Sequence, residues 1–315
     1  MITPARGNPV PGLMLALRRL AAAVLAPIAP RTCKRRRSRV RPTAPGHVVL
    51  LGAGPGSADL ITLRGLRALQ SADVVLYDRL ADPALLAQTR HGARLVSVGK
   101  APGAHAVPQD RINALLVQAA RQGHRVVRLK CGDPGVFGRG AEEASALDQA
   151  GIAWSIIPGV TAACAAAAAA GSFLTERGRT ERVILATGHR RAGDQTDWAG
   201  CAAPGTTLAC YMGVTAAAGI QAELLAAGWP ALSQVEIVSC AQTARQRVLH
   251  GTLADLAALC NAQAELNPAI LLIRWPAPSA LSAHRGLAEA ADPQARKSSP
   301  RSSTGAEWVR APTLM

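Results

Sequence analysis

The chain has 315 residues, of which 49% are hydrophobic and only 3% are aromatic. This length allows one large domain or two modest ones, and a core of Ala, Val, Leu and Ile suits an α/β protein with buried parallel strands. The net charge of +15 raises the question of a nucleic-acid or lipid partner, which depends on where the charge lies.

The excess of basic residues lies near the N-terminus. Residues 1–45 hold ten Lys or Arg and no acid, whereas residues 46–276 hold 20 Lys or Arg against 17 Asp or Glu. Such an arm could touch nucleic acid or anionic lipid, but a solvated, disordered leader is the simpler prediction. Its apolar stretch is broken by Arg18 and Arg19 and precedes the strongest charges, the reverse of a secretion signal. We expect a cytoplasmic protein without a nucleic-acid or membrane partner.

The seven cysteines are scattered and form no CxxC pair. Neither a zinc site nor a disulfide framework follows from this spacing. Reduced thiols in a cytoplasmic protein fit best, and we expect no metal.

Apolar strand patterns alternate with helical patterns from Gly46 onward. This alternation predicts βαβ units and a parallel sheet. The predicted strands are 47–51, 73–77, 94–98, 125–129, 153–157, 182–187, 206–211, 234–239 and 269–274, and the predicted helices include 83–90, 108–122, 140–150, 165–170, 215–227 and 252–263.

Pro158 and Gly159 mark the predicted boundary between two α/β halves. We predict an N-terminal α/β domain over 46–158, a C-terminal α/β domain over 159–276 and a ligand cleft between them. The Ala-, Ser-, Pro- and Arg-rich segment 277–315 has no apolar period and is predicted to be a disordered tail.

The turn GAGPG, Gly52 to Gly56, follows the first predicted strand. Glycine-rich turns at this position can bind phosphate groups, but this one also fits an ordinary tight strand-to-helix turn. Asp78 ends the second strand, as in nicotinamide-binding domains. However, the glycines run GxGxG rather than GxGxxG, and Pro55 removes one backbone amide.

Further motifs help to decide between a nicotinamide-binding domain and other functions of the GAGPG turn. After GAGPG the chain carries VVLYDRL (74–80), VGK (98–100), VPQDRIN (107–113), VVRLKCGDPGVFGRGAEE (126–143), IIPGVTAA (156–163), TGHR (187–190) and YMG (211–213). In this order the motifs resemble the tetrapyrrole methylase family, and within it the uroporphyrinogen-III C-methyltransferases. The resemblance runs from about Gly46 to Trp275.

The resemblance implies a homodimer whose two α/β domains hold S-adenosyl-L-methionine in the cleft between them. It implies transfer of two methyl groups to uroporphyrinogen III, at C2 and C7, to give precorrin-2 via precorrin-1 in sirohaem or cobalamin biosynthesis. By the same resemblance, Asp78 is the proton acceptor and Lys100 the proton donor. The resemblance also implies that Arg139 is a catalytic residue and that Glu142 and Arg177 bind the substrate, at positions that hold or deprotonate the macrocycle. The implied cofactor contacts are Pro55, Cys131, Gly132, Asp133, Val136, Thr161, Ala162, Met212 and Ala241.

These residue types suit the chemistry. Methyl transfer to a pyrrole carbon creates a cationic intermediate that must lose a proton, and a positioned base accelerates this loss. Arginines bind carboxylates through bidentate forks, and the macrocycle is rich in carboxylates. Each residue also has a plainer interpretation: Asp78 and Lys100 can form a salt bridge, Thr161 can begin a helix, and Met212 can lie in the core.

Several positions depart from the family pattern. Cys131, Ala241 and Arg274 stand where glycines are usual, and we expect these losses to reshape one cofactor pocket. Two alternatives therefore accompany the main hypothesis: another precorrin methylase of the family, or an inactive relative that binds cofactor or tetrapyrrole. A nicotinamide-dependent oxidoreductase would follow from GAGPG alone.

Overall fold

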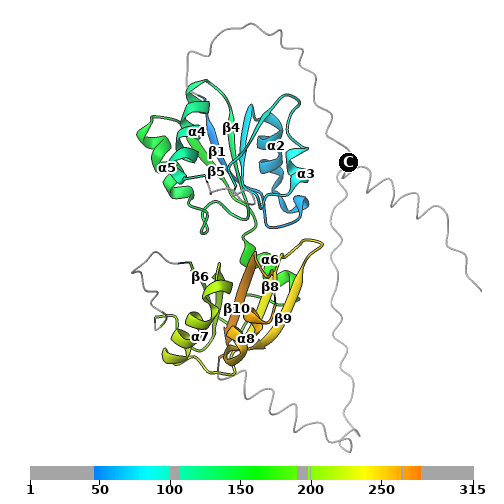
Figure 1. The fold of residues 1–315 in the computed structure, drawn as a ribbon, viewed down its shortest axis with the longest axis vertical. Coiled ribbons are helices and arrows are strands. Elements are labelled where there is room, and N and C mark those ends of the chain that lie inside the picture. Colours follow the sequence, from blue (N-terminus) through cyan, green and yellow to red (C-terminus); the bar gives the residue numbers. More distant parts are fainter. Residues whose placement is uncertain (1–45, 100–106, 190–197, 199, 264, 278–315) are drawn as a thin grey trace, which may run out of the picture. The chain divides into compact units, whose positions relative to one another are not determined.

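The computed structural model describes residues 46–99, 107–189, 198, 200–263 and 265–277. The predicted leader, nearly all of the predicted tail and the predicted proton donor Lys100 lie outside these ranges. Two five-stranded sheets make up the described part (Figure 1). Within it, no helix is long and apolar enough to cross a membrane.

The first sheet is parallel throughout, as the alternation of strands and helices predicts. Its strand order is β3-β2-β4-β1-β5, so β1 lies between β4 and the edge strand β5. The strands are β1 (Val48–Gly52), β2 (Val74–Tyr77), β3 (Arg94–Ser97), β4 (Val126–Lys130) and β5 (Trp154–Ile157).

Helices cover both faces of the first sheet. Helices α4 (Gln109–Arg121) and α5 (Gly140–Gln149) lie on one face, and α2 (Leu63–Ser71) and α3 (Pro83–Leu86) lie on the other (Figure 1). A short 3-10 helix, Ala58–Leu60, precedes α2. Because side chains alternate along a strand, each strand supplies both apolar layers. Helix α3 is shorter than the predicted 83–90.

The second sheet corrects the prediction of parallel pairing. Its order is β6-β7-β10-β8-β9, and only the β6–β7 pair is parallel. Strands β8 and β9 are joined by a short hairpin connection, which reverses the chain direction between the paired strands. The strands are β6 (Arg182–Thr187), β7 (Thr206–Tyr211), β8 (Gln234–Ser239), β9 (Arg247–Thr252) and β10 (Ala269–Trp275).

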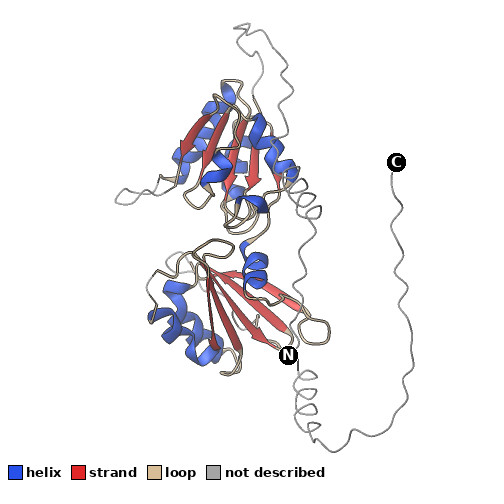
Figure 2. Cartoon of the chain, turned by 90° about the vertical axis from the view of Figure 1, so that its right-hand side faces the viewer, coloured by secondary structure: helices blue, strands red, loops and turns tan. Residues whose placement is uncertain are grey.

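Strand β9 was missing from the sequence prediction. It forms one edge of the sheet and has no fully buried residue, so it lacks the apolar run by which the other strands are recognised. Helix α6 (Ala162–Ala169) covers one face of this sheet, and α7 (Ala217–Ala226) and α8 (Leu256–Asn261) cover the other (Figure 2). Short 3-10 helices, Val214–Ala216 and Leu253–Asp255, precede α7 and α8.

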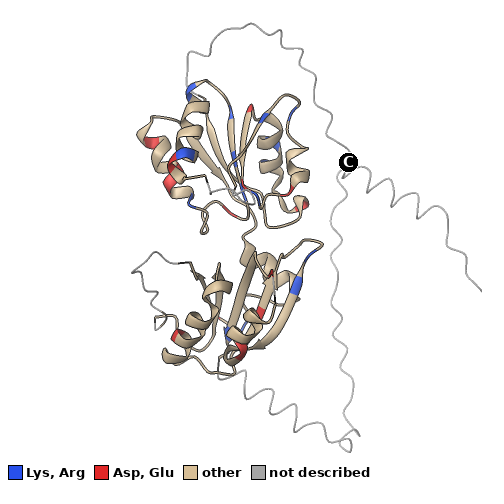
Figure 3. Ribbon diagram, viewed as in Figure 1, with Lys and Arg blue, Asp and Glu red and all other residues tan. Residues whose placement is uncertain are grey.

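Helix α6 consists of alanine apart from Cys164 and carries no charge (Figure 3). Small side chains let its backbone approach the sheet, where Ala163 and Ala166 are fully buried. The chain passes from one sheet to the other between Ile157 and Arg182, and the predicted domain boundary at 158/159 falls in this connection. The division into two domains itself stays a prediction.

Close backbone packing at the end of β1 predicts an effect on stability. A Cβ atom added at Gly52 would lie 2.5 Å from the backbone nitrogen of Gly159 and 2.7 Å from the carbonyl oxygen of Gly132. Overpacking of this kind costs about 1–3 kcal/mol. We therefore expect Gly52→Ala to lower the free energy of unfolding by this amount in urea titrations.

The matched control for this substitution is Gly219→Ala in helix α7. Nothing lies within 4 Å of a Cβ atom there, and alanine stabilises a helix interior by roughly 0.5–1 kcal/mol relative to glycine. Equal stability of the two variants would contradict the proposed close packing.

Candidate active site

The candidate site begins where strands β1 and β4 end at the same edge of the first sheet. Gly54 and Gly132 pair across this edge: each amide donates to the other's carbonyl, at 3.2 and 2.9 Å. Both have positive φ, +75° and +71°, a conformation that glycine adopts without the steric cost of a Cβ atom. The pairing joins the GAGPG turn, including the buried Pro55, to the loop Cys131–Asp133.

Asp133 holds this loop together through its two carboxylate oxygens. One accepts the amide of Gly135 at 2.8 Å, and the other accepts the amide of Gly159 at 2.9 Å. The second bond ties the loop after β4 to the segment after β5. The aspartate of the GDP motif is therefore an organiser of the backbone, and it places the amides and carbonyls around it.

Tyr211 is the centre of a second group of predicted residues. Its hydroxyl bonds to the Thr161 hydroxyl at 2.6 Å and accepts the Ala163 amide at 3.1 Å. Burial raises the pKa of Tyr211, although both hydrogen bonds act in the other direction. The ring of Phe137 lies on that of Tyr211, with centroids 4.9 Å apart. Tyr211 thus fixes the start of α6 and the end of the GDPGVFG loop together.

Three predicted cofactor contacts, Val136, Ala162 and Ala241, pack against the apolar cluster that contains Tyr211. Thr161 begins α6, as its plainer interpretation predicts, but its hydroxyl bonds to Tyr211 instead of capping the helix. The sequence analysis did not predict Tyr211 or Phe137 as site residues, although they stand in the YMG and GDPGVFGRG motifs. Met212 is not a core residue: it has a φ of 53° and is 46% exposed.

Cys131 lies where the glycine-rich turn meets Asp78. Burial raises the pKa of its thiol, and the Asp78 carboxylate raises it further, whereas hydrogen bonds from the amides of Gly56 and Gly132 act in the other direction. Gly56 in turn lies against the carbonyl of Ala241. The positions 55–56, 131–133 and 241, which are far apart in sequence, therefore come together.

Asp78 forms a salt bridge, but not with the residue considered from the sequence. Its carboxylate lies 2.7 Å from Arg128 on β4. Arg128 also reaches Glu143 at 2.9 Å, and Lys130 reaches the same Glu143 at 2.9 Å. Arg128, Lys130 and Glu143 are buried. Burial disfavours the charged form of both cations, and it lowers the pKa of Lys130. For Arg128 the attraction of Asp78 and Glu143 outweighs burial, so the pKa of Arg128 is raised.

The sequence reasoning missed these three residues, although a signal was present. In VVRLK, Arg128 and Lys130 stand two residues apart in an otherwise apolar strand, so both point to one face of the sheet. Two cations on a buried face require an anion. Glu143, four residues after Arg139 in the FGRGAEE motif, supplies it.

Arg139 and Glu142 form the exposed part of the candidate site. Arg139 precedes α5 in a left-handed conformation, with a φ of 55°, and its guanidinium makes two bonds of 2.7 Å to Glu142. The bond to Glu142 raises the pKa of Arg139. Phe137 and Arg139 line a hollow of about 510 Å³ beside strand β5.

Two other predicted positions stand apart. Arg177 is exposed in the loop after α6 and has no ion pair among the described residues. Arg274, also expected at the cofactor pocket, lies away from Tyr211 along strand β10. Ile270 pairs with Tyr211 at one end of β10, whereas Arg274 pairs with Thr207 towards the other. Its guanidinium binds Glu236 at 2.9 Å and Ser172 at 2.8 Å.

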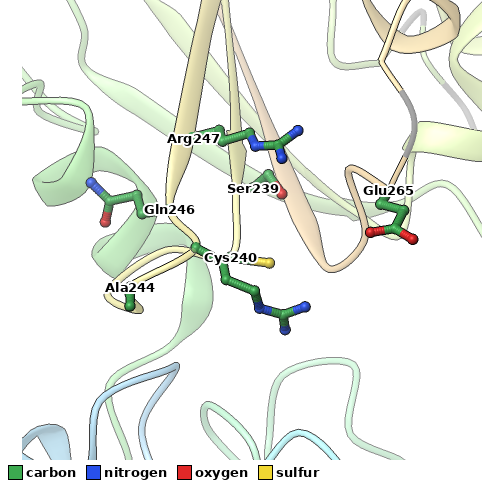
Figure 4. A pocket seen from close by; sticks show the side chains of 7 residues that line it. Ser239, Cys240, Ala244, Gln246, Arg247 and Glu265 are labelled. Carbon is green, nitrogen blue, oxygen red and sulfur yellow. The ribbon is translucent and has the colours of Figure 1, made fainter.

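A second hollow, of about 310 Å³, lies at the end of the β8–β9 hairpin, just after Ala241 (Figure 4). Its lining residues are Ser239, Cys240, Ala244, Arg245, Gln246, Arg247 and Glu265. None of them was predicted to be a site residue. Its lining residues Cys240 and Ala244 stand close to Ala241 in the sequence.

Known proteins resemble this chain in both sequence and structure. Residues 47–257 match the family of tetrapyrrole (corrin/porphyrin) methylases. The chain belongs to this family. The predicted α/β fold of the tetrapyrrole methylase type and the prediction of an S-adenosylmethionine-dependent methyltransferase are thereby confirmed.

Two curated relatives illustrate the match. The methylase is 49% identical over 229 residues to siroheme synthase 2 of Aeromonas hydrophila, an alignment that covers 72% of this chain and 48% of that protein. It is 46% identical over 228 residues to siroheme synthase of Salmonella typhi, covering 72% and 50%. The methylase therefore spans about half the length of the curated relatives it matches.

Solved structures agree with this assignment. Uroporphyrin-III C-methyltransferase from Thermus thermophilus, complexed with S-adenyl homocysteine, is 36% identical with a TM-score of 0.62, covering 73% of this chain and 92% of that one. A cobalt precorrin-4 methyltransferase of cobalamin biosynthesis is 31% identical with a TM-score of 0.65, covering 73% and 95%.

The buried charges of the methylase predict a contrast between two neighbouring glutamates. Glu143→Ala leaves Arg128 and Lys130 buried without their shared anion, which typically costs about 3–5 kcal/mol. Glu142→Ala removes an exposed ion pair, typically worth no more than about 1 kcal/mol. Urea unfolding of both variants measures this difference, and similar losses would show that the buried pair does not support the fold.

Proposed function

We propose that this methylase transfers two methyl groups from S-adenosyl-L-methionine to uroporphyrinogen III, at C2 and C7, giving precorrin-2 by way of precorrin-1. One observation carries the proposal. The predicted cofactor positions from three separate segments meet around Gly56, and Asp78, the predicted base, lies beside them through Cys131. The names of the siroheme synthases and of the Thermus thermophilus enzyme support the same reaction.

The residues present fit the cofactor. A Cβ atom added at Gly132 would have no neighbour closer than 3.8 Å, so this glycine leaves its backbone uncovered by a side chain. Val136, Ala162 and Ala241 add an apolar wall. We assign Pro55, residues 131–133, Thr161 and Met212 to the same binding surface. When bound, S-adenosylmethionine supplies an activated methyl group on a sulfonium.

The chain's own residues have two tasks in this proposal. Methyl transfer to a ring carbon makes the macrocycle a cation, which must lose a proton from another position, and the Asp78 carboxylate is the group assigned to accept that proton. A positioned base of this kind contributes about 10²–10⁴-fold to the rate. Arg139 and Arg177 bind substrate carboxylates, and Glu142 orients Arg139 through its two bonds. Lys100 is assigned as proton donor on the resemblance alone.

A second candidate reaction has one observation in its favour. The cobalt precorrin-4 methyltransferase has a TM-score of 0.65, slightly above that of the uroporphyrin-III enzyme, although its sequence identity is lower. Methylation of a later precorrin would use the same fold and cofactor. The position of the added methyl groups distinguishes the two reactions. An inactive relative would bind the cofactor without turnover, and the proposal of a homodimer awaits a measurement of mass in solution.

Methylation of uroporphyrinogen III tests the proposed reaction directly. Under anaerobic conditions with S-adenosylmethionine, we expect the product to gain two methyl groups, detected by mass spectrometry. Asp78→Asn should lower kcat by about 10²–10⁴-fold, because the neutral amide cannot accept the proton.

Asp82→Asn is the control, four residues along the same segment. Asp82 accepts the Ala84 amide at the start of α3, and asparagine serves equally well at a helix N-cap. We expect unchanged kcat in this variant. A product that carries methyl groups at other positions would favour the second candidate reaction.

Cys131 gives a test of the cofactor surface that does not depend on turnover. Cys131→Leu adds bulk beside Gly56 and should weaken binding of S-adenosylhomocysteine by about tenfold, or about 1.4 kcal/mol. Cys131→Gly removes the side chain and should bind at least as tightly as the natural chain. Calorimetric titration measures both variants, and equal affinity in the leucine variant would place the cofactor elsewhere.

A further inference from the structure

Strand β4 carries two cations on a face that is otherwise apolar. Arg128 and Lys130 are each 3% exposed, and they share that face with Val126, which packs in the cluster beneath α4 and α5. Buried charges are costly unless they are paired and hydrogen-bonded. Replacing such groups by apolar residues is often neutral or stabilising, so fold stability by itself gives little reason to keep them.

The buried cations Arg128 and Lys130 outnumber the one buried carboxylate, Glu143, that they share. Glu143 is fully buried, and both of its oxygens bond to Lys130, at 3.0 and 2.9 Å. Arg128 Nε shares one of those oxygens at 2.9 Å. The buried part of the group therefore holds two positive charges and one negative charge. The second negative charge is Asp78, whose side chain is 31% exposed.

Arg128 is fixed in three directions. Nε donates to Glu143, Nη1 donates to the carbonyl of Leu129 at 3.1 Å, and Nη2 donates to Asp78 Oδ1 at 2.7 Å. A planar guanidinium held in this way cannot turn without losing a bond. It therefore fixes one oxygen of Asp78, while Oδ2 has no hydrogen-bond partner among the residues that the structure describes.

Glu143 also lies close in sequence to Arg139, the other predicted catalytic residue that the structure describes. Glu143 stands in the first turn of α5, directly after Glu142 and four residues after Arg139. Its bonds to β4 thus fix the start of the helix from which Arg139 and Glu142 extend. Asp78 and Arg139 come from separate segments, and the buried Arg128–Glu143 pair joins the two.

We propose that Arg128 is a positioning residue, which Glu143 anchors and which holds the Asp78 carboxylate in the orientation needed to accept the substrate proton. This inference rests on the proposed function. It gives the buried charges a role in the reaction in addition to their effect on stability. A misplacement of about 1 Å can cost about a hundredfold in rate, which is the scale expected when Arg128 is lost.

A double-mutant cycle tests this role. We expect Arg128→Met to lower kcat for methylation of uroporphyrinogen III by about ten- to a hundredfold, with unchanged affinity for S-adenosylhomocysteine. In an Asp78→Asn background, Arg128→Met should have no further effect on kcat, because it acts only through Asp78. A residue with a merely structural role would lower kcat by the same factor in both backgrounds, and that result would overturn the proposal.

Arg274→Met is the matched control. Arg274 also pairs with a glutamate, Glu236, at 2.9 Å, but it lies on the second sheet. This variant should keep the natural kcat in both backgrounds, even if its melting temperature falls. Equal losses of kcat in Arg274→Met and Arg128→Met would show a general effect of removing an ion pair, and would contradict the inference.

Arg128→Lys keeps the cycle informative if the methionine variant does not fold. Lysine retains the charge but has no planar fork to join Glu143 and Asp78, so kcat should fall, and again only where Asp78 is present. Unchanged kcat in Arg128→Lys would overturn the inference. Absence of methyl transfer by the natural chain, with S-adenosylhomocysteine still bound, would instead overturn the proposed function itself.

Discussion

The buried carboxylate of Glu143 is the constraint on which the candidate site depends. It is fully buried and binds both Arg128 and Lys130, so β4 and the first turn of α5 cannot separate without exposing charges to an apolar interior. Arg128 extends this constraint to Asp78 on the neighbouring strand. One buried anion thus sets the positions of residues from three segments of the first sheet.

A second constraint comes from Tyr211 on the second sheet. Its hydroxyl bonds to Thr161 and to the amide of Ala163, and its ring contacts Phe137. Through these contacts Tyr211 holds both the start of α6 and the loop that follows β4. Together with Asp133, which binds the amides of Gly135 and Gly159, they hold the glycine-rich segments in place.

Departures from the family pattern differ in their consequences. Cys131 and Ala241 both lie against the GAGPG turn, at Gly56, so they change the proposed cofactor surface itself. Arg274 instead lies towards the other end of β10, paired with Glu236. Arg274 is therefore separated along the strand from the end of β10 that pairs with Tyr211.

The sequence by itself determined the strands of the first sheet, the family and most candidate residues, because apolar periodicity and glycine-rich turns are local properties of the chain. Only the tertiary structure decided how Asp78 is paired, since Arg128 and Glu143 are 50 and 65 residues away from it. It also decided the antiparallel pairing of β7, β10, β8 and β9 and the place of Arg274. Pairing partners and strand direction depend on contacts between distant residues, which no local pattern specifies.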